Sequence, residues 1–219
     1  MNPPDDLRIR LAGVGIFALA FGYVEASVVV YLRALYYPQG FAFPLNVLGH
    51  QHLSVELGRE AATIVMLAAV AAVAGAKRWQ RMGYFMVGFG IWDIAFYFWV
   101  WVILRWPASL VEWDILFLLP IPWIGPVVAP LLISLALIVC GGTIIVRSGR
   151  GIAFRPGALS WVLGASGTLL LLYSFMRDTP AALEGKLPQP YHYEYLAAGL
   201  VLCVTGWYLA CRTHPRPIS

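Results

Sequence analysis

Charged residues are scarce in this chain of 219 residues: Asp, Glu, Lys and Arg make up 12%, and hydrophobic residues 60%. Soluble globular domains average about 25% charged and about 45–50% apolar residues. The composition therefore excludes a secreted disulfide scaffold, a disordered protein and a nucleic-acid-binding domain, and it predicts a chain surrounded by a lipid bilayer. The net charge of +4 does not indicate a nucleic-acid partner, because the basic residues stand singly between long apolar runs.

Motifs that would identify a reaction are absent as well. The three cysteines, Cys140, Cys203 and Cys211, have no Cys-x-x-Cys spacing, so we expect neither a disulfide framework nor a thiolate metal site. The chain has no Gly-x-Ser-x-Gly, no phosphate-binding loop and no His-Glu-x-x-His. Because no predicted span has a histidine near its centre, bis-histidine haem is also disfavoured. The sequence thus predicts topology better than it predicts an activity.

Six segments are long and apolar enough to cross a bilayer, since a spanning helix needs roughly 20 mostly apolar residues. We interpret all six as α-helices, because backbone groups in hydrocarbon must bond within the protein and the alternating pattern of a β-barrel is absent. The expected fold is an all-α polytopic integral membrane protein with a single domain, 1–219. The predicted spans cover 11–32, 56–76, 82–104, 125–146, 158–176 and 194–211.

A proline-rich segment separates the third and fourth spans. Proline interrupts helices because it lacks a backbone N–H and clashes with the preceding turn. We predict a short re-entrant or interfacial helix over 109–119, covered by protein or by a polar cavity. The prolines are Pro107, Pro120, Pro122, Pro126 and Pro130.

Lys and Arg fall mainly on one side of the six spans, and such residues are enriched in cytoplasmic loops. One side, which includes both terminal segments, carries ten of them, and the other carries five. We therefore predict that both termini are cytoplasmic and that the membrane is an inner or plasma membrane. The ten are Arg8, Arg10, Lys77, Arg78, Arg81, Arg147, Arg150, Arg155, Arg212 and Arg216, and the five are Arg33, Arg59, Arg105, Arg177 and Lys186.

Small residues recur every four positions in the first two spans. Such spacing lets helices approach closely in lipid, so we expect both stripes to serve helix packing. The first span carries Ala18, Gly22 and Ala26, and the second carries Ala68, Ala72 and Ala76.

Carboxylates and histidines gather in the opposite, outward half of the bundle. Glu25 lies eight residues before Arg33, and Asp93 lies twelve before Arg105, which places them about 12 Å and about 18 Å below the outer helix ends. A charged side chain at the bilayer centre costs roughly 2.5–3.5 kcal/mol on insertion scales, so such residues usually face the bundle interior and are paired, protonated or functional. Tyr97 shares the helix face of Asp93.

A dense polar cluster begins the second span, between His50 and Glu60. If the helix extends back to His52, the side chains of His52, Glu56 and Glu60 lie on one face, four residues apart. Imidazoles and carboxylates are ligands for first-row metals. We therefore predict a divalent metal site at His50, His52 and Glu56, with His192 as a further candidate.

Two simpler interpretations of this cluster stay open. Ser54 is a good N-cap, and a helix that begins there would leave both histidines in a loop. Glu56 or Glu60 would equally well pair with Arg59 or with another arginine of the outward half.

From these features we predict a membrane-embedded enzyme whose outward-facing acidic cavity acts on an apolar or lipid-linked substrate. The expected chemistry is acid–base catalysis, assisted by the metal ion where one binds, and aromatic rings would stabilise a cationic intermediate. The predicted catalytic residues are Glu25, Asp93, Tyr97 and Glu60, and the predicted substrate-binding residues are Trp92, Phe96, Arg59, Arg105 and Asp114.

Two other classes of protein fit the same residues. An accessory or structural subunit of a larger membrane complex would pair its acids with arginines and present its aromatic surface to partners. A proton- or cation-coupled transporter would use Glu25 and Asp93 as steps of a relay. The inward half of the sequence, however, offers almost no buried ionisable group to continue such a path.

Overall fold

The computed structural model describes residues 3–41, 50–152, 154–184, 186 and 190–212, with the side chains of 3–5, 50 and 51 left out. Six of its helices are long and apolar enough to cross a membrane. These are α1 (Pro3–Tyr36), α2 (His50–Ala74), α3 (Arg78–Leu104), α4 (Val128–Gly149), α5 (Ala158–Met176) and α7 (Tyr193–Arg212), and a short α6 (Thr179–Leu183) follows α5. The chain is therefore an all-α polytopic membrane protein, as its sequence predicts.

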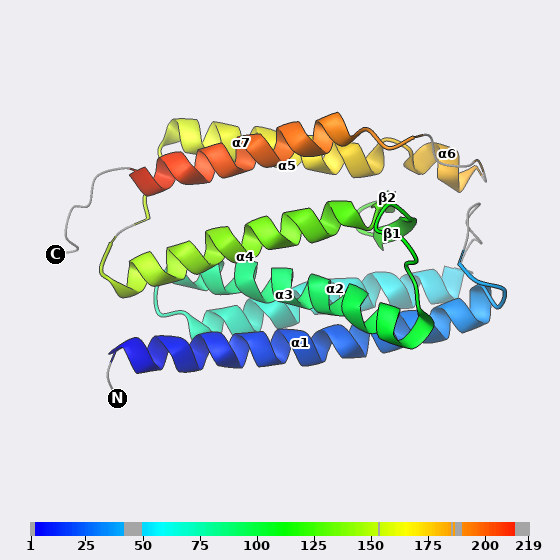
Figure 1. Ribbon diagram of the computed structural model, residues 1–219, viewed down its shortest axis with the longest axis horizontal. Coiled ribbons are helices and arrows are strands. Elements are labelled where there is room, and N and C mark those ends of the chain that lie inside the picture. The colour runs from blue at the N-terminus through cyan, green and yellow to red at the C-terminus, as the bar shows by residue number, and fades with distance from the viewer. Residues whose placement is uncertain (1–2, 42–49, 153, 185, 187–189, 213–219) are drawn as a thin grey trace.

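The helices are arranged around α3, which packs against α1, α2 and α4. Helices α5 and α7 pack mainly on each other and form a layer on the side of α4 away from α1 (Figure 1). Helix α1 begins and α7 ends at the same end of the molecule (Figure 1), which we call the terminal end. The opposite end, where the segment between α3 and α4 lies, is called the hairpin end.

That segment forms a β-hairpin, so the prediction of a helix over 109–119 is wrong. Strand β1 (Trp113–Phe117) pairs antiparallel with β2 (Trp123–Pro126), with Asp114 opposite Gly125. Trp, Ile and Phe in β1 are residues that favour strands. Pro120 and Pro122 lie in the connection between the strands, where a missing N–H costs no ladder hydrogen bond.

The small-residue stripe of α1 is buried, whereas that of α2 is not. Ala18, Gly22 and Ala26 all face the bundle interior, but Ala68, Ala72 and Ala76 are exposed, which corrects the expectation for α2. This helix is turned so that its two glutamates and the residues in register with them face inward. The inward face consists of Glu56, Glu60, Thr63, Leu67 and Ala71.

Candidate functional site

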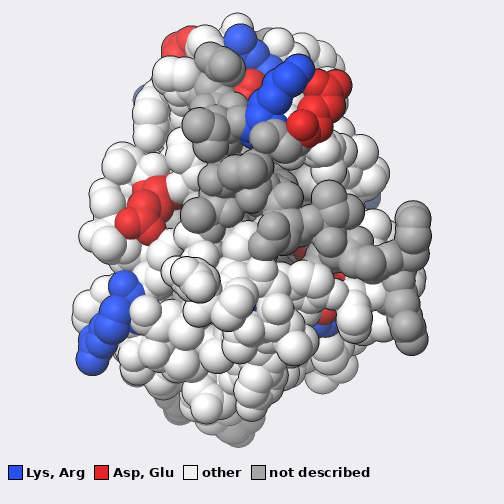
Figure 2. All heavy atoms as spheres, turned by 90° about the vertical axis from the view of Figure 1, so that its right-hand side faces the viewer, with Lys and Arg blue, Asp and Glu red and all other residues white. Residues whose placement is uncertain are grey.

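Two adjoining cavities lie between α1, α2, α3 and β1. The larger has a volume of about 120 Å³ and the smaller about 60 Å³; we call them the large chamber and the small chamber, and together the polar cavity. They adjoin because both are lined by Val29, Arg59, Glu60, Phe96 and Ile115. Seen from the hairpin end, the described surface shows charged side chains only in a few separate places (Figure 2).

Each wall of the polar cavity contributes ionisable side chains. Helix α1 supplies Glu25 and Arg33, α2 supplies Glu56, Arg59 and Glu60, α3 supplies Asp93 and Tyr97, and β1 supplies Asp114. Five carboxyl groups and two guanidinium groups thus surround these two small chambers.

Arg59 binds two of the carboxylates. Its guanidinium forms an ion pair with Glu25 of α1 and another with Glu56, one turn earlier on α2, where the N···O distance is 2.8 Å. Thr63, one turn later, donates its hydroxyl to the second oxygen of Glu25 at 2.7 Å. Positions three and four apart on a helix share a face, so α2 brings Glu56, Arg59 and Thr63 together against Glu25.

A second network joins α1, α3 and the hairpin through Asp114. One carboxylate oxygen accepts from Arg33 at 3.1 Å, and the other accepts from the Tyr97 hydroxyl at 3.2 Å. The Arg33 guanidinium also lies over the ring of Trp106, 3.6 Å from its centroid, and 4.5 Å from that of Phe41. Asp114 and Arg33 are both buried, and their mutual bonding offsets the cost of removing two charges from water.

Glu60 and Asp93 differ from the other three acids because, among the described residues, they accept hydrogen bonds only from neutral groups. The Leu118 backbone N–H donates to both oxygens of Glu60, at 2.9 and 3.0 Å. The Ser134 hydroxyl of α4 donates to Asp93 at 2.8 Å. Neither carboxyl has an ion-pair partner among the described residues, and both line the small chamber.

Gly90 explains how Ser134 reaches Asp93. A Cβ at Gly90 would lie 2.6 Å from the Ser134 carbonyl oxygen, so only glycine lets α4 come this close to α3. The approach places the Ser134 hydroxyl, which is buried, beside the carboxyl of Asp93 three residues further along α3.

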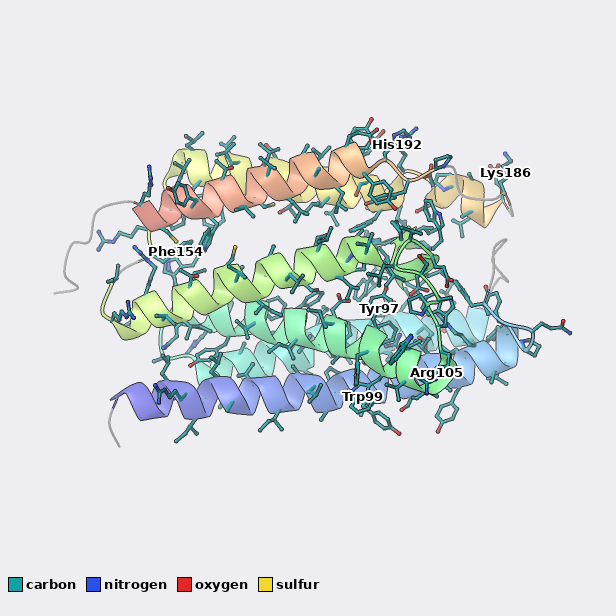
Figure 3. All side chains as sticks on the ribbon, in the orientation of Figure 1. Tyr97, Trp99, Arg105, Phe154, Lys186 and His192 are labelled. Carbon is teal, nitrogen blue, oxygen red and sulfur yellow. The ribbon has the colours of Figure 1, made fainter. Side chains whose placement is uncertain are left out.

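Eight of the nine residues predicted to form a catalytic or substrate site line the polar cavity; Arg105 does not. Arg105 ends α3 in a left-handed conformation (φ 54°), and its guanidinium lies on Trp101, 5.1 Å from the ring centroid. Figure 3 labels Arg105 near the end of α3, and Tyr97 further back on the same helix. The eight are Glu25, Arg59, Glu60, Trp92, Asp93, Phe96, Tyr97 and Asp114.

The predicted metal site finds no support in the described side chains, among which no three His, Cys, Asp or Glu lie close enough to share an ion. Helix α2 begins at His50, so Ser54 is not its N-cap. Yet His52 is exposed and hydrogen-bonded to Tyr36, while Glu56 pairs with Arg59. His192 bonds Glu194 instead, and the His50 side chain lies outside the described residues.

Three residues of the site were not predicted. Arg33 follows Glu25 by eight positions, with Val29 midway, and this four-residue spacing could have placed all three on one face of α1. Thr63 stands three residues after Glu60, on the same face of α2. Ser134 gives no such signal, because its position depends on how α4 packs on α3.

No protein-family model, curated protein or solved structure matches the chain. The fold and the geometry of the polar cavity are therefore the basis for the function.

Proposed function

We propose that this protein is a membrane-embedded enzyme that uses the polar cavity for acid–base chemistry on the polar end of an apolar or lipid-linked substrate. The observation that carries the proposal is the pair Glu60 and Asp93. Both carboxyls line one small chamber, and neither forms an ion pair or a hydrogen bond with a described cation. A carboxyl that is not bound by a guanidinium can give a proton to a substrate atom or take one from it.

The other charged groups of the cavity fit positioning roles. Arg59 is held by two carboxylates, so its guanidinium has a fixed place beside Glu60. Tyr97 and Arg33 are fixed in the same way by Asp114. Such pre-positioned groups hold a substrate near the acid and the base without moving during the reaction.

The size of the cavity supports a small reacting group. Sites that enclose a drug-sized molecule measure about 300–1,000 Å³, whereas the large chamber measures about 120 Å³. Only the polar end of a lipid-sized molecule fits inside, and its apolar remainder would stay in the bilayer. Trp92, Phe96 and Phe117 line the small chamber and would shield the reacting atoms from water.

Transport across the membrane is less well supported, because a relay needs polar groups along its whole length. The buried carboxylates among the described residues lie in the hairpin half. In the terminal half the described core is formed by Val14, Ala71, Tyr84, Val87 and Ile145.

The test compares the protein with variants of the two unpaired carboxyls. Wild-type protein, Glu60→Gln and Asp93→Asn are each reconstituted with a lipid extract of the host membrane, and lipids are quantified over time by mass spectrometry. We expect at least one lipid species to be consumed by the wild type and each variant to be slower by at least about 100-fold, the usual contribution of a general acid or base.

Glu184→Gln is the matched control, because Glu184 is exposed and pairs only with Lys186 among the described residues. It should retain wild-type turnover, and thermal unfolding should show that all three variants are folded. A wild-type lipid profile identical to that of the Glu60 and Asp93 variants would refute the enzyme proposal and favour an accessory subunit.

A further inference from the structure

A second, apolar cavity lies between the α3–α4 layer and the α5–α7 layer, towards the terminal end. It has a volume of about 630 Å³ and continues into a cavity of about 580 Å³ at its mouth. We call the two together the crevice. They are continuous because both are lined by Trp79, Met82, Phe154, Pro156 and Trp161. The crevice shares no lining residue with the polar cavity.

The inner part of the crevice is apolar and is lined by small residues of α5 and α7. Gly164 and Ala165 come from α5, and Gly206 and Ala210 come from α7. Gly206 serves the contact between α5 and α7, because a Cβ there would lie 2.8 Å from the Ser160 carbonyl oxygen, whereas a Cβ at Gly164 would meet open space. Trp207 also lines the crevice, and its indole nitrogen is buried with no hydrogen-bond partner among the described residues.

The mouth of the crevice is basic and aromatic. Arg78, at the start of α3, and Arg155, before α5, both line it and are exposed. Trp79 packs on Phe154 and Trp161, with ring centroids 5.1 and 6.2 Å apart, and the Arg78 guanidinium lies 4.8 Å from the Trp79 centroid. Figure 3 labels Phe154 near the terminal end.

We propose that the crevice binds an anionic phospholipid of the membrane, with its acyl chains between α4 and the α5–α7 pair and its phosphate between Arg78 and Arg155. Basic pockets between transmembrane helices bind anionic headgroups, and Trp rings sit at the level of headgroups. A helix of another protein would need no pair of arginines at the mouth, so the charge favours a lipid.

Native mass spectrometry of the purified protein tests whether the crevice binds an anionic phospholipid. Protein in detergent is mixed with equal amounts of phosphatidylglycerol and phosphatidylcholine, and the lipid retained on the wild type is identified. We expect one phosphatidylglycerol to be retained in preference to phosphatidylcholine. Equal retention of the two lipids by the wild type, or retention of neither, would overturn the proposal without the use of any variant.

Substitutions then locate the site. Each basic side chain near anionic lipid contributes about 1 kcal/mol, which is about five-fold in affinity, so Arg78→Gln and Arg155→Gln should each weaken retention about five-fold. A Cβ at Gly164 has open space around it, so Gly164→Leu should fill the crevice and expel the lipid without disturbing the fold.

Two controls match these variants. Arg8 is exposed on α1, and Gly13 also has open space at its Cβ, but neither lines the crevice. Arg8→Gln and Gly13→Leu should therefore retain phosphatidylglycerol as the wild type does. Retention unchanged in Arg78→Gln, Arg155→Gln and Gly164→Leu would show that the lipid binds elsewhere. A copurifying polypeptide that is displaced by Gly164→Leu, in place of a lipid, would assign the crevice to a protein partner.

Discussion

Arg59 neutralises two buried carboxylates at once, and the cost of losing it is correspondingly large. Glu25 and Glu56 are each about 5% exposed or less, and both bind its guanidinium. A buried charge that loses its partner keeps the full cost of its own desolvation. The stability of this part of the bundle therefore depends on one side chain that also lines the proposed active site.

We predict that Arg59→Gln lowers the free energy of unfolding by about 3 kcal/mol, the lower end of the range for breaking a buried ion pair. Adding Glu25→Gln and Glu56→Gln to it should recover most of the lost free energy, because neither former partner of Arg59 is then charged. Denaturant unfolding in detergent measures the free energy of unfolding of the single and the triple variant. Arg105→Gln, at an exposed position, is the control. Wild-type stability in Arg59→Gln would contradict the assigned ion pairs.

Tyr191 lies outside the spanning helices and packs against Trp113 of β1, with ring centroids 5.9 Å apart. Burial raises the pKa of Tyr191 from 10.0 to about 12, although a hydrogen bond with Ser174 opposes the rise. The folded state then holds this proton more tightly than the unfolded state does. The stability it contributes is complete below pH about 10 and is lost as the pH rises through about 12.

Thermal unfolding of the wild type should therefore show a fall in melting temperature over this alkaline interval that is smaller in Tyr191→Phe, which has no group to titrate. If the melting temperature fell equally steeply with pH in the two proteins, a buried, neutral Tyr191 would be excluded.

The cost of burying a carboxylate in lipid is what allowed Glu25 and Asp93 to be predicted from the sequence as interior residues. The same reasoning fails for His52, because an imidazole at the end of a helix has no strong preference between a cavity and the surface. It bonds Tyr36 and remains exposed. The sequence marks Arg33 only as the end of a helix, although its side chain is buried (8% exposed) and completes the network around Asp114.

Helix α1 reaches the site only because it crosses α3 very closely. A Cβ at Gly22 would lie 2.8 Å from the Ala95 Cβ and 3.0 Å from the Phe96 nitrogen. This contact lies one turn before Glu25. It therefore fixes where the Glu25 side chain lies relative to α2. Close packing through small residues is the common way in which helices associate in lipid.

We predict that Gly22→Ala lowers the free energy of unfolding by about 1–3 kcal/mol, the usual cost of overpacking. The matched control is Gly13→Ala on the same helix, where the added Cβ meets open space and alanine favours the helix. Denaturant unfolding in detergent measures the free energy of unfolding of both variants and of the wild type. If both were as stable as the wild type, α1 and α3 would not be in contact at Gly22.

Hydropathy predicts the six helices well because length and apolar composition alone decide what can cross a bilayer. It does not predict the rotation of α2, since Ala residues occupy both of its faces and only Glu56 and Glu60 distinguish the inward one. The hairpin is not predicted either, because its prolines indicate only that the helices are interrupted, and an apolar segment as short as 113–117 fits a strand or a helix equally well. That error matters because the hairpin supplies Asp114 and the Leu118 N–H to the site.

At the scale of the whole molecule, the polar cavity and the crevice lie towards opposite ends of the helices. The terminal end carries the basic mouth of the crevice, and the hairpin end carries the acidic cavity. Lys and Arg favour the cytoplasmic side, and anionic lipids are abundant in the cytoplasmic leaflet. On these grounds we predict that the terminal end is cytoplasmic and that the polar cavity faces the outer leaflet.

This orientation can be measured by cysteine labelling in intact cells. In a chain whose Cys140, Cys203 and Cys211 are replaced by Ala, a single cysteine is introduced as Lys186→Cys at the hairpin end or as Arg8→Cys at the terminal end. We predict that a membrane-impermeant maleimide labels the first variant in intact cells and the second only after permeabilisation, because ten of the fifteen Lys and Arg residues lie on the side of Arg8. The reverse labelling pattern would show that the polar cavity faces the cytoplasm. Its proposed substrate would then lie in the inner leaflet.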